Sequence, residues 1–145
     1  MIAVDSNILV YAHRKDSPFY GAASKRLGEL AEGTATWAIP WPCVHEFLAI
    51  VTHPRVYGPP TPLARALEQI EAWLESPTLT LLTEPAAYWA TLRALLTEGQ
   101  IAGGRVHDAR VAALCLDHSV RELWSADRDF SRFRGLNVVN PLLGH

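Results

Sequence analysis

Four carboxylates spread along the whole chain are the residues best suited to chemistry: Asp5, Glu46, Asp108 and Asp127. Two unit charges about 5 Å apart repel by about 3 kcal/mol at an effective dielectric of about 20, so acids that share a site need cations or protons. Oxygen ligands, without cysteine or histidine at metal-ligand spacing, suit Mg²⁺ or Mn²⁺. Such an ion activates an attacking water and stabilises a leaving oxygen, which predicts phosphoryl chemistry.

Two of these acids come at the ends of predicted strands. Asp5 directly follows the apolar run Ile2-Ala3-Val4, and Asp127 follows the predicted strand 122–125. The carboxyl ends of neighbouring parallel strands share one edge of a sheet, and functional sites gather there. We therefore expect both carboxylates at the same edge. The alternative for each is an ordinary helix cap, because aspartate is a favoured N-cap residue.

The other two acids lie in predicted helices and have apolar neighbours. Glu46 has Cys43 three residues before it and Ile50 four residues after it, so it does not belong to a simple polar face. Asp108 is followed at helical spacing by three apolar residues, Val111, Ala112 and Cys115. The alternatives are that Glu46 extends past its neighbours into water and that Asp108 caps its helix.

The segment from Ser125 to Phe130 carries several polar groups in a short space. Asp127 and Asp129 could both bind a metal, or Asp129 could cap the short helix that follows. Ser125 could position a water or hold Asp127. Phe130 is expected in the core rather than as a platform for a nucleic-acid base.

Alternating strands and helices are predicted to position these acids. The predicted strands cover residues 2–4, 36–39, 79–82, 122–125 and 138–139, and the predicted helices cover 7–13, 18–32, 42–53, 62–74, 85–98 and 108–117. The fourth helix carries Leu63, Leu67, Ile70 and Leu74 at the spacing of one apolar face. This alternation predicts a three-layer α/β domain in which helices flank a mainly parallel central sheet.

Length and composition set broad limits. With 145 residues, 49% hydrophobic and 19% charged, the chain fits one globular domain over 1–145. Cys43 and Cys115 lie in apolar stretches, which predicts buried thiols. The beginning of the sequence lacks the pattern of a signal peptide, and no apolar stretch approaches the roughly 18 residues that cross a bilayer. We therefore expect a soluble, cytoplasmic protein.

The basic residues are mostly arginines rather than lysines. The net charge of −2 gives no overall attraction to nucleic acid, but eleven arginines stand against two lysines. The last third of the chain holds several arginines, and five of them are candidates for phosphate contact: Arg105, Arg110, Arg128, Arg132 and Arg134. Arginine suits bidentate phosphate contacts, so these residues either hold a phosphate backbone or are solvated surface charges. Among the histidines, only His13 is a candidate for substrate contact.

Four motifs of the chain resemble those of the PIN-domain nucleases, and more narrowly those of the VapC toxins of bacterial toxin–antitoxin pairs. They are Ile2-Ala3-Val4-Asp5-Ser6-Asn7, Trp41-Pro42-Cys43-Val44-His45-Glu46-Phe47, Val106-His107-Asp108-Ala109 and Trp124-Ser125-Ala126-Asp127-Arg128-Asp129-Phe130. The motifs follow the family's order and span nearly the whole chain. The resemblance implies a PIN-like fold.

The resemblance also implies roles for individual residues. The family's catalytic acids match Asp5, Glu46, Asp108 and Asp127. The implied metal ligands are Asp5, Asp108, Asp127 and Asp129, and the supporting or substrate-binding positions are Asn7, Ser125 and Arg128. The implied activity is Mg²⁺- or Mn²⁺-dependent RNA cleavage that leaves a 5′-phosphate and a 3′-hydroxyl. The implied assembly is a homodimer held by a cognate VapB-type antitoxin, whose tail blocks the site.

Two other functions remain open at this stage. A phosphatase or phosphoryl-acceptor domain also places aspartates at parallel strand ends, but such sites need a lysine late in the chain, and the only lysines here are Lys15 and Lys25. A non-catalytic protein that binds RNA or a protein partner is the second alternative. Four clustered negative charges would face phosphate in such a protein, which argues against it.

Overall fold

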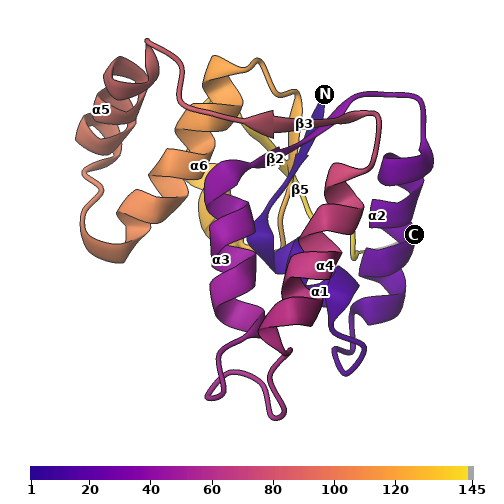
Figure 1. Ribbon diagram of the computed structural model, residues 1–145. Helices are drawn as coiled ribbons and strands as arrows, with labels where there is room; N and C mark the ends of the chain where they lie inside the picture. The colour runs from indigo at the N-terminus through magenta and orange to yellow at the C-terminus, as the bar shows by residue number, and fades with distance from the viewer. Residues whose placement is uncertain (144–145) are drawn as a thin grey trace.

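Five parallel strands form one sheet in the order β3-β2-β1-β4-β5 in the computed structural model, which describes residues 1–143 (Figure 1). The strands are β1 (Ile2–Val4), β2 (Trp37–Pro40), β3 (Leu79–Leu82), β4 (Glu122–Trp124) and β5 (Asn137–Val139). Every pairing in the sheet is parallel. The prediction of a mainly parallel central sheet is confirmed.

The strand order places β1 in the middle of the sheet, between β2 and β4. Ala3 pairs with Ala38 on one side and with Leu123 on the other. The chain first builds β1, β2 and β3 in one direction and then returns to place β4 on the opposite side of β1. The ends of β1 and β4 are directly joined, because the backbone N–H of Asp5 donates to the carbonyl oxygen of Trp124 at 2.9 Å. This reversal brings residues 5 and 125–129 to the same edge.

Helices flank the sheet, with α5 and α6 on the left of Figure 1 and α2 on the right. The helices are α1 (Ser6–His13), α2 (Tyr20–Glu32), α3 (Trp41–Val51), α4 (Leu63–Leu74), α5 (Tyr88–Gly99) and α6 (Val106–Asp117), with short 3₁₀ helices η1 (Gly103–Arg105) and η2 (Arg128–Arg132). Three helices begin two or three residues away from the predicted position, and the other three begin one residue away. Ser17 accepts a hydrogen bond from the backbone N–H of Phe19, so a turn precedes α2. The helix of Asp108 begins two residues earlier, at Val106, and α5 begins three residues later, at Tyr88.

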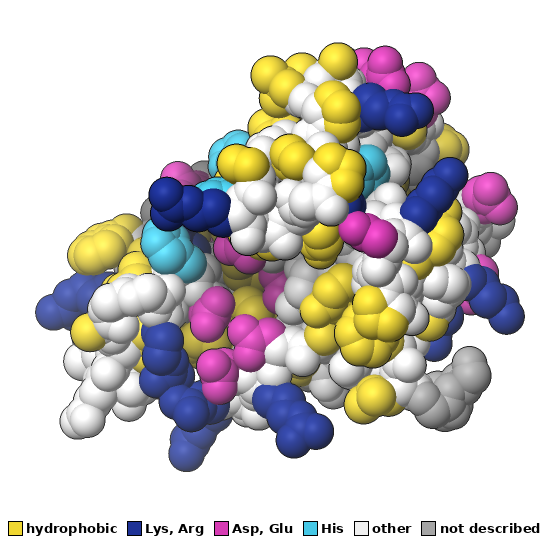
Figure 2. All heavy atoms as spheres, turned by 90° about the horizontal axis from the view of Figure 1, so that it is seen from below, with side chains coloured by type: hydrophobic (Ala, Val, Ile, Leu, Met, Phe, Trp, Pro, Cys, Tyr) yellow, Lys and Arg dark blue, Asp and Glu magenta, His cyan; other side chains and the backbone are white. Residues whose placement is uncertain are grey.

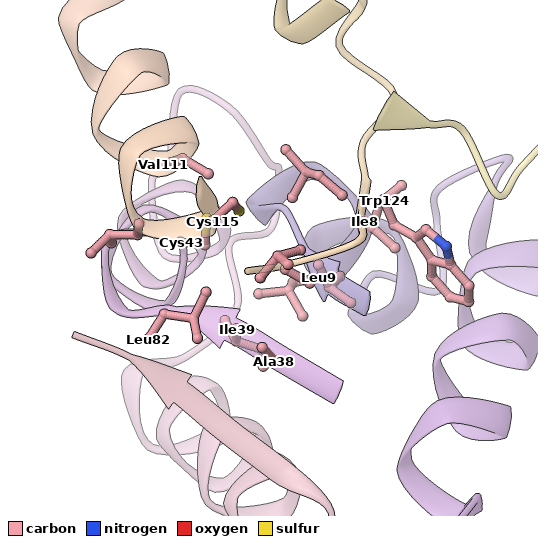
Figure 3. Close-up of a cluster of buried hydrophobic side chains, with 14 of the residues drawn as sticks. Ile8, Leu9, Ala38, Ile39, Cys43, Leu82, Val111, Cys115 and Trp124 are labelled. Carbon is pink, nitrogen blue, oxygen red and sulfur yellow. The ribbon is translucent and has the colours of Figure 1, made fainter. Parts of the chain in front are cut away.

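The core lies between the sheet and the helices and includes both cysteines. Cys43 and Cys115 are buried free thiols, as predicted, among apolar side chains such as Ile39, Leu82 and Val111 (Figure 3). Phe130 is also buried, which confirms its assignment to the core. Among the described residues, none of the helices combines the length and apolar character that crossing a bilayer requires. The acidic edge therefore rests on a packed apolar base.

The leucine stripe of α4 is not the buried face of that helix. Leu63, Leu67 and Leu74 are all exposed, whereas Ala66 and Trp73 are buried. With about 100° of rotation per residue, the two buried residues lie roughly 60–80° away from the stripe. The ring of Trp73 packs edge-on against the ring of Phe47 in α3, with 4.8 Å between their centroids. This aromatic contact orients the helix, because a large ring buries more apolar area than a leucine does.

Candidate functional site

Acidic side chains gather around a hollow on the face of the molecule seen from below in Figure 2, where the strands have their carboxyl ends. Each acid is held by a different element. Asp5 is the N-cap of α1, Glu46 lies in α3, Asp108 lies in the first turn of α6, and Asp127 is the N-cap of η2. The four predicted acids thus start from elements that the fold brings to one edge.

Asp5 is the most deeply buried of these acids, with 5% of its surface exposed. Its Oδ1 accepts a hydrogen bond from the backbone N–H of Ser6 at 2.7 Å, and its Oδ2 accepts one from the hydroxyl of Ser125 at 2.8 Å. Burial disfavours the charged form and raises the pKa of Asp5 to about 6, although the hydrogen bonds from Ser125 and Ser6 favour ionisation. Asp5 is therefore both the cap of α1 and an anion that a nearby cation would stabilise.

Glu46 is linked to Asp5 through Ser6. The hydroxyl of Ser6 donates to Oε1 of Glu46 at 2.5 Å and lies 3.4 Å from Oδ1 of Asp5. The Glu46 carboxylate is one of the causes that raise the pKa of Asp5. Glu46 is exposed, as the alternative view of it held, yet it points to the acidic edge rather than away from it.

The other three acids form a compact group. Asp108, Asp127 and Asp129 each offer a carboxylate oxygen, and these oxygens all lie within 4.8 Å of one another. Burial raises the pKa of Asp108, and the charges of Asp127, Glu46 and Asp129 raise it further, while Arg105 acts in the opposite direction. Oxygen ligands alone are the set that hard divalent ions prefer, so these residues fit Mg²⁺ or Mn²⁺. Asp5 and Glu46 lie outside this group of three.

Two capping alternatives are resolved by the hydrogen bonds. Asp108 makes no side-chain cap bond, because α6 begins at Val106 and leaves Asp108 free to face the other acids. At η2 the cap is Asp127, whose Oδ1 accepts from the backbone N–H of Asp129 at 2.9 Å. The alternative in which Asp129 caps η2 is therefore wrong, because η2 begins at Arg128 and its N-cap is two residues before Asp129. Capping fixes Asp127 and turns Asp129 toward the same site.

Ser125 and Asn7 tie the two halves of the site together. The Ser125 hydroxyl, which donates to Asp5, also accepts from the backbone N–H of Asp127 at 3.0 Å and from Nδ2 of Asn7 at 3.2 Å. The Asn7 side chain donates to Oδ2 of Asp5 at 3.3 Å and accepts from the backbone N–H of Ala126 at 3.1 Å. Ser125 thus holds Asp127, one of its two predicted roles, through the backbone.

Replacing Ser125 by alanine is expected to lower the free energy of unfolding by about 1–3 kcal/mol, since it removes partners from the buried Asp5 carboxylate and from two partly buried amides. Urea unfolding at pH 7 with a chelator measures the change. Ser131→Ala is the matched control, because Ser131 is exposed and only donates to the carbonyl oxygen of Arg128. The control is expected to change stability by less than about 0.5 kcal/mol. Equal effects of the two substitutions would contradict this role of Ser125.

Two predicted candidates, His13 and Arg128, do not belong to the acidic group. The ring of His13 is held between Oε1 of Gln69 at 3.0 Å and Oγ1 of Thr61 at 3.1 Å, so its partners come from α4 and the preceding loop. These hydrogen bonds give His13 a structural role in joining α1 to α4. Arg128 is exposed, and among residues 1–143 its side chain forms no ion pair with an acid.

Ser6 and Cys43 are parts of the site that sequence reasoning missed. Ser6 joins two of the acids, and the thiol of Cys43 lies 3.5 Å from Oδ1 of Asp5. The sequence held a signal for each. Ser6 directly follows Asp5, and Cys43 lies three residues before Glu46, on the same side of α3.

Comparisons with known proteins bear on the family and the fold of this chain. A family model described as PIN domain matches residues 2–136. The chain is 31% identical over 140 residues to Ribonuclease VapC48 of Mycobacterium tuberculosis, and the match covers 97% of each protein.

Two solved structures resemble this fold at low sequence identity. VapBC2 of Rickettsia felis, bound to a DNA fragment from their promoter, matches with a TM-score of 0.67 and 21% identity over 96% of this chain and 98% of that chain. Mycobacterium tuberculosis VapC20, a sarcin-ricin loop cleaving toxin, matches with a TM-score of 0.68 and 16% identity over 91% and 94% of the two chains. At these identities the likeness concerns the fold alone.

Proposed function

This chain belongs to the PIN-domain family, with a VapC ribonuclease as a full-length relative, and from that premise we propose that it is a metal-dependent endoribonuclease. In this proposal it acts as the toxin of a VapBC-type toxin–antitoxin pair and cleaves RNA in the cytoplasm. The observation that carries the proposal is the group of Asp108, Asp127 and Asp129, joined to Asp5 through the hydroxyl of Ser125.

The proposed metal ligands are Asp108, Asp127 and Asp129, with Asp5 as a further ligand. Their oxygens fit Mg²⁺ or Mn²⁺. When bound, such an ion would act as a Lewis acid that lowers the pKa of a water and neutralises charge on a phosphodiester. Asp5 belongs to the set because its charge is buried, so it gains most from a neighbouring cation. Ser125, Ser6 and Asn7 orient the Asp5 carboxylate through the hydrogen bonds described above.

Glu46 is proposed to take part in proton transfer. Its carboxylate is exposed and held by the Ser6 hydroxyl, so it can accept a proton from a water at the rim of the hollow. Arg128 is exposed next to Asp127 and Asp129 in sequence and is proposed to contact the RNA backbone. The products expected of a water attacking phosphorus with the 3′-oxygen leaving are a 5′-phosphate and a 3′-hydroxyl.

The proposed partners follow from the VapC family. The chain is expected to form a homodimer and to be held inactive by a VapB-type antitoxin. One similar solved structure is a VapBC complex by its name, and the exposed leucines of α4 offer an apolar surface on this chain. The antitoxin is expected to cover the acidic edge, since occupying that edge would exclude RNA.

The test is cleavage of total cellular RNA by the purified protein with Mg²⁺, with Mn²⁺ and with a chelator. Discrete cuts that require metal are expected, and the 5′ ends of the fragments should carry phosphate. Release of phosphate from a simple phosphoester without RNA cleavage would instead indicate a phosphatase. Metal binding without cleavage of any RNA, by a folded and antitoxin-free protein, would indicate a non-catalytic protein.

A further inference from the structure

A second cavity lies beside the acidic group. It has a volume of about 450 Å³ and is enclosed by α5, η1 and the end of η2. Three of its lining residues are arginines, Arg105, Arg132 and Arg134, and Glu98 is the one acid in the lining. Within the described part of the chain, Glu98 forms no ion pair with any of them. The cavity therefore carries a net positive charge next to a strongly negative site.

Two arginines of the cavity lining act on the neighbouring acids. Nη2 of Arg132 lies 3.8 Å from Oδ1 of Asp129, and Arg105 acts electrostatically on Asp108. Figure 2 shows the same arrangement on the surface, with basic side chains gathered beside the acidic hollow. A strand that is cut at the acids and continues past Asp129 meets these arginines next.

Arg105 has an unused donor. Its Nε is buried and has no hydrogen-bond partner among residues 1–143. A buried donor without a partner costs free energy, so its presence calls for an explanation. Because this Nε is shielded from solvent, Arg105 grips a phosphate in the cavity through its two Nη groups, or through Nε and one Nη after its side chain rotates. The cavity is also large enough for a phosphate with part of its sugar.

Resting on the proposed ribonuclease activity, we propose that this cavity binds a backbone phosphate of the RNA close to the one that is cleaved. Arg105 and Arg134 hold that phosphate, and Arg132 stands between it and the acids. The contact positions the strand and fixes which bond reaches the metal ligands, while carrying no base recognition of its own. An RNA strand is favoured over an acidic protein segment because Arg132, in the cavity lining, lies 3.8 Å from Asp129, beside the proposed cleavage site.

The test uses the cleavage-inactive Asp5→Asn protein and the shortest RNA oligonucleotide that the unmodified protein cleaves. Fluorescence anisotropy over a range of salt gives the affinity and its salt dependence. Arg105→Gln and Arg134→Gln are each expected to weaken binding by about 3–10-fold and to lower the slope of log K against log salt by about 0.7, the loss of one single-strand phosphate contact. Arg121→Gln is the control, because Arg121 is exposed at the opposite, amino-terminal end of β4.

A second measurement identifies the phosphate. Each backbone phosphate of the oligonucleotide is replaced in turn by a neutral methylphosphonate. One position is expected to weaken binding to the Asp5→Asn protein but not to its Arg134→Gln derivative, since the two changes remove the same contact. Arg134 is exposed, so this variant folds even if Arg105→Gln does not.

The outcomes separate the two proposals. If the unmodified protein cleaves no RNA, the proposed function fails and this inference fails with it. If it cleaves RNA, but the arginine variants bind like Arg121→Gln in affinity and salt slope, only the phosphate cavity is overturned. Unchanged RNA binding together with weaker binding of the antitoxin would overturn it in favour of a protein-binding cavity.

Discussion

Asp5→Asn is expected to abolish RNA cleavage while leaving the metal-free protein at least as stable as before. Cleavage should fall by roughly 10³-fold or more, which corresponds to a loss of about 4 kcal/mol of transition-state stabilisation. The amide keeps the shape of the carboxylate and can still accept from the backbone N–H of Ser6. It removes a buried charge and the repulsion of that charge with Glu46, which stabilises the metal-free fold. The same loss of charge weakens the proposed metal site.

Two measurements check this expectation, cleavage of RNA with Mn²⁺ and the melting temperature with a chelator. Asp16→Asn is the matched control, because Asp16 is an exposed aspartate that pairs with Arg14 and does not belong to the acidic group. The control should cleave RNA normally. A clear fall in the metal-free melting temperature of Asp5→Asn would show that Asp5 serves mainly as the cap of α1, and full activity of that variant would remove Asp5 from the site.

The metal-free protein is expected to lose stability as the pH rises from about 4 to about 7. The pKa of Asp5 is about 6 in the folded protein, against an ordinary value of 3.8, so folding favours the protonated form. The contribution is fully present below pH 3.8 and is lost as the pH rises through about 6. The difference in pKa corresponds to about 3 kcal/mol. The pKa of Asp108 is also raised, so its contribution has the same sign.

Urea unfolding of the parent protein and of Asp5→Asn, both with a chelator, isolates this effect. The difference between their free energies of unfolding should change by about 2 kcal/mol between pH 4 and pH 7, in favour of the asparagine variant at the higher pH. Adding Mn²⁺ at pH 7 should stabilise the parent more than the variant. A difference that stays constant with pH would show that Asp5 titrates normally, and would remove the buried charge from this account.

Much of the fold could be read from local patterns. The apolar runs before Asp5 and Asp127 predicted two strands, and both strands are present and adjacent. Helix boundaries were less accurate, since proline and serine signal a turn as readily as a helix start, as Ser17 shows. Local patterns also could not show whether Asp108 is the cap of its helix, because aspartate is favoured both at the N-cap and in the first turn. Its place in the first turn of α6 depends on Val106, whose helical conformation no local signal marked.

Local sequence patterns did not show which face of α4 packs against the core. Helical spacing shows that Leu63, Leu67 and Leu74 share a face, but it does not show which face meets the core. Trp73 decides this through its contact with Phe47, a residue 26 positions earlier in the chain (73 − 47). A contact between two helices forms only in the assembled fold, so the spacing of apolar residues within one helix does not reveal it.

The sequence by itself determined the α/β class and the parallel sheet and indicated four candidate acids, because hydrophobic period, helical spacing and strand-end position are local properties. Only the tertiary structure decided how those acids are joined. Ser6 meets Glu46 across 40 residues and Ser125 meets Asp5 across 120. The burial that raises the pKa of Asp5 and the arginine cavity beside Asp129 arise in the same way. Each depends on the chain reversing around β1, which brings distant segments to one edge of the sheet.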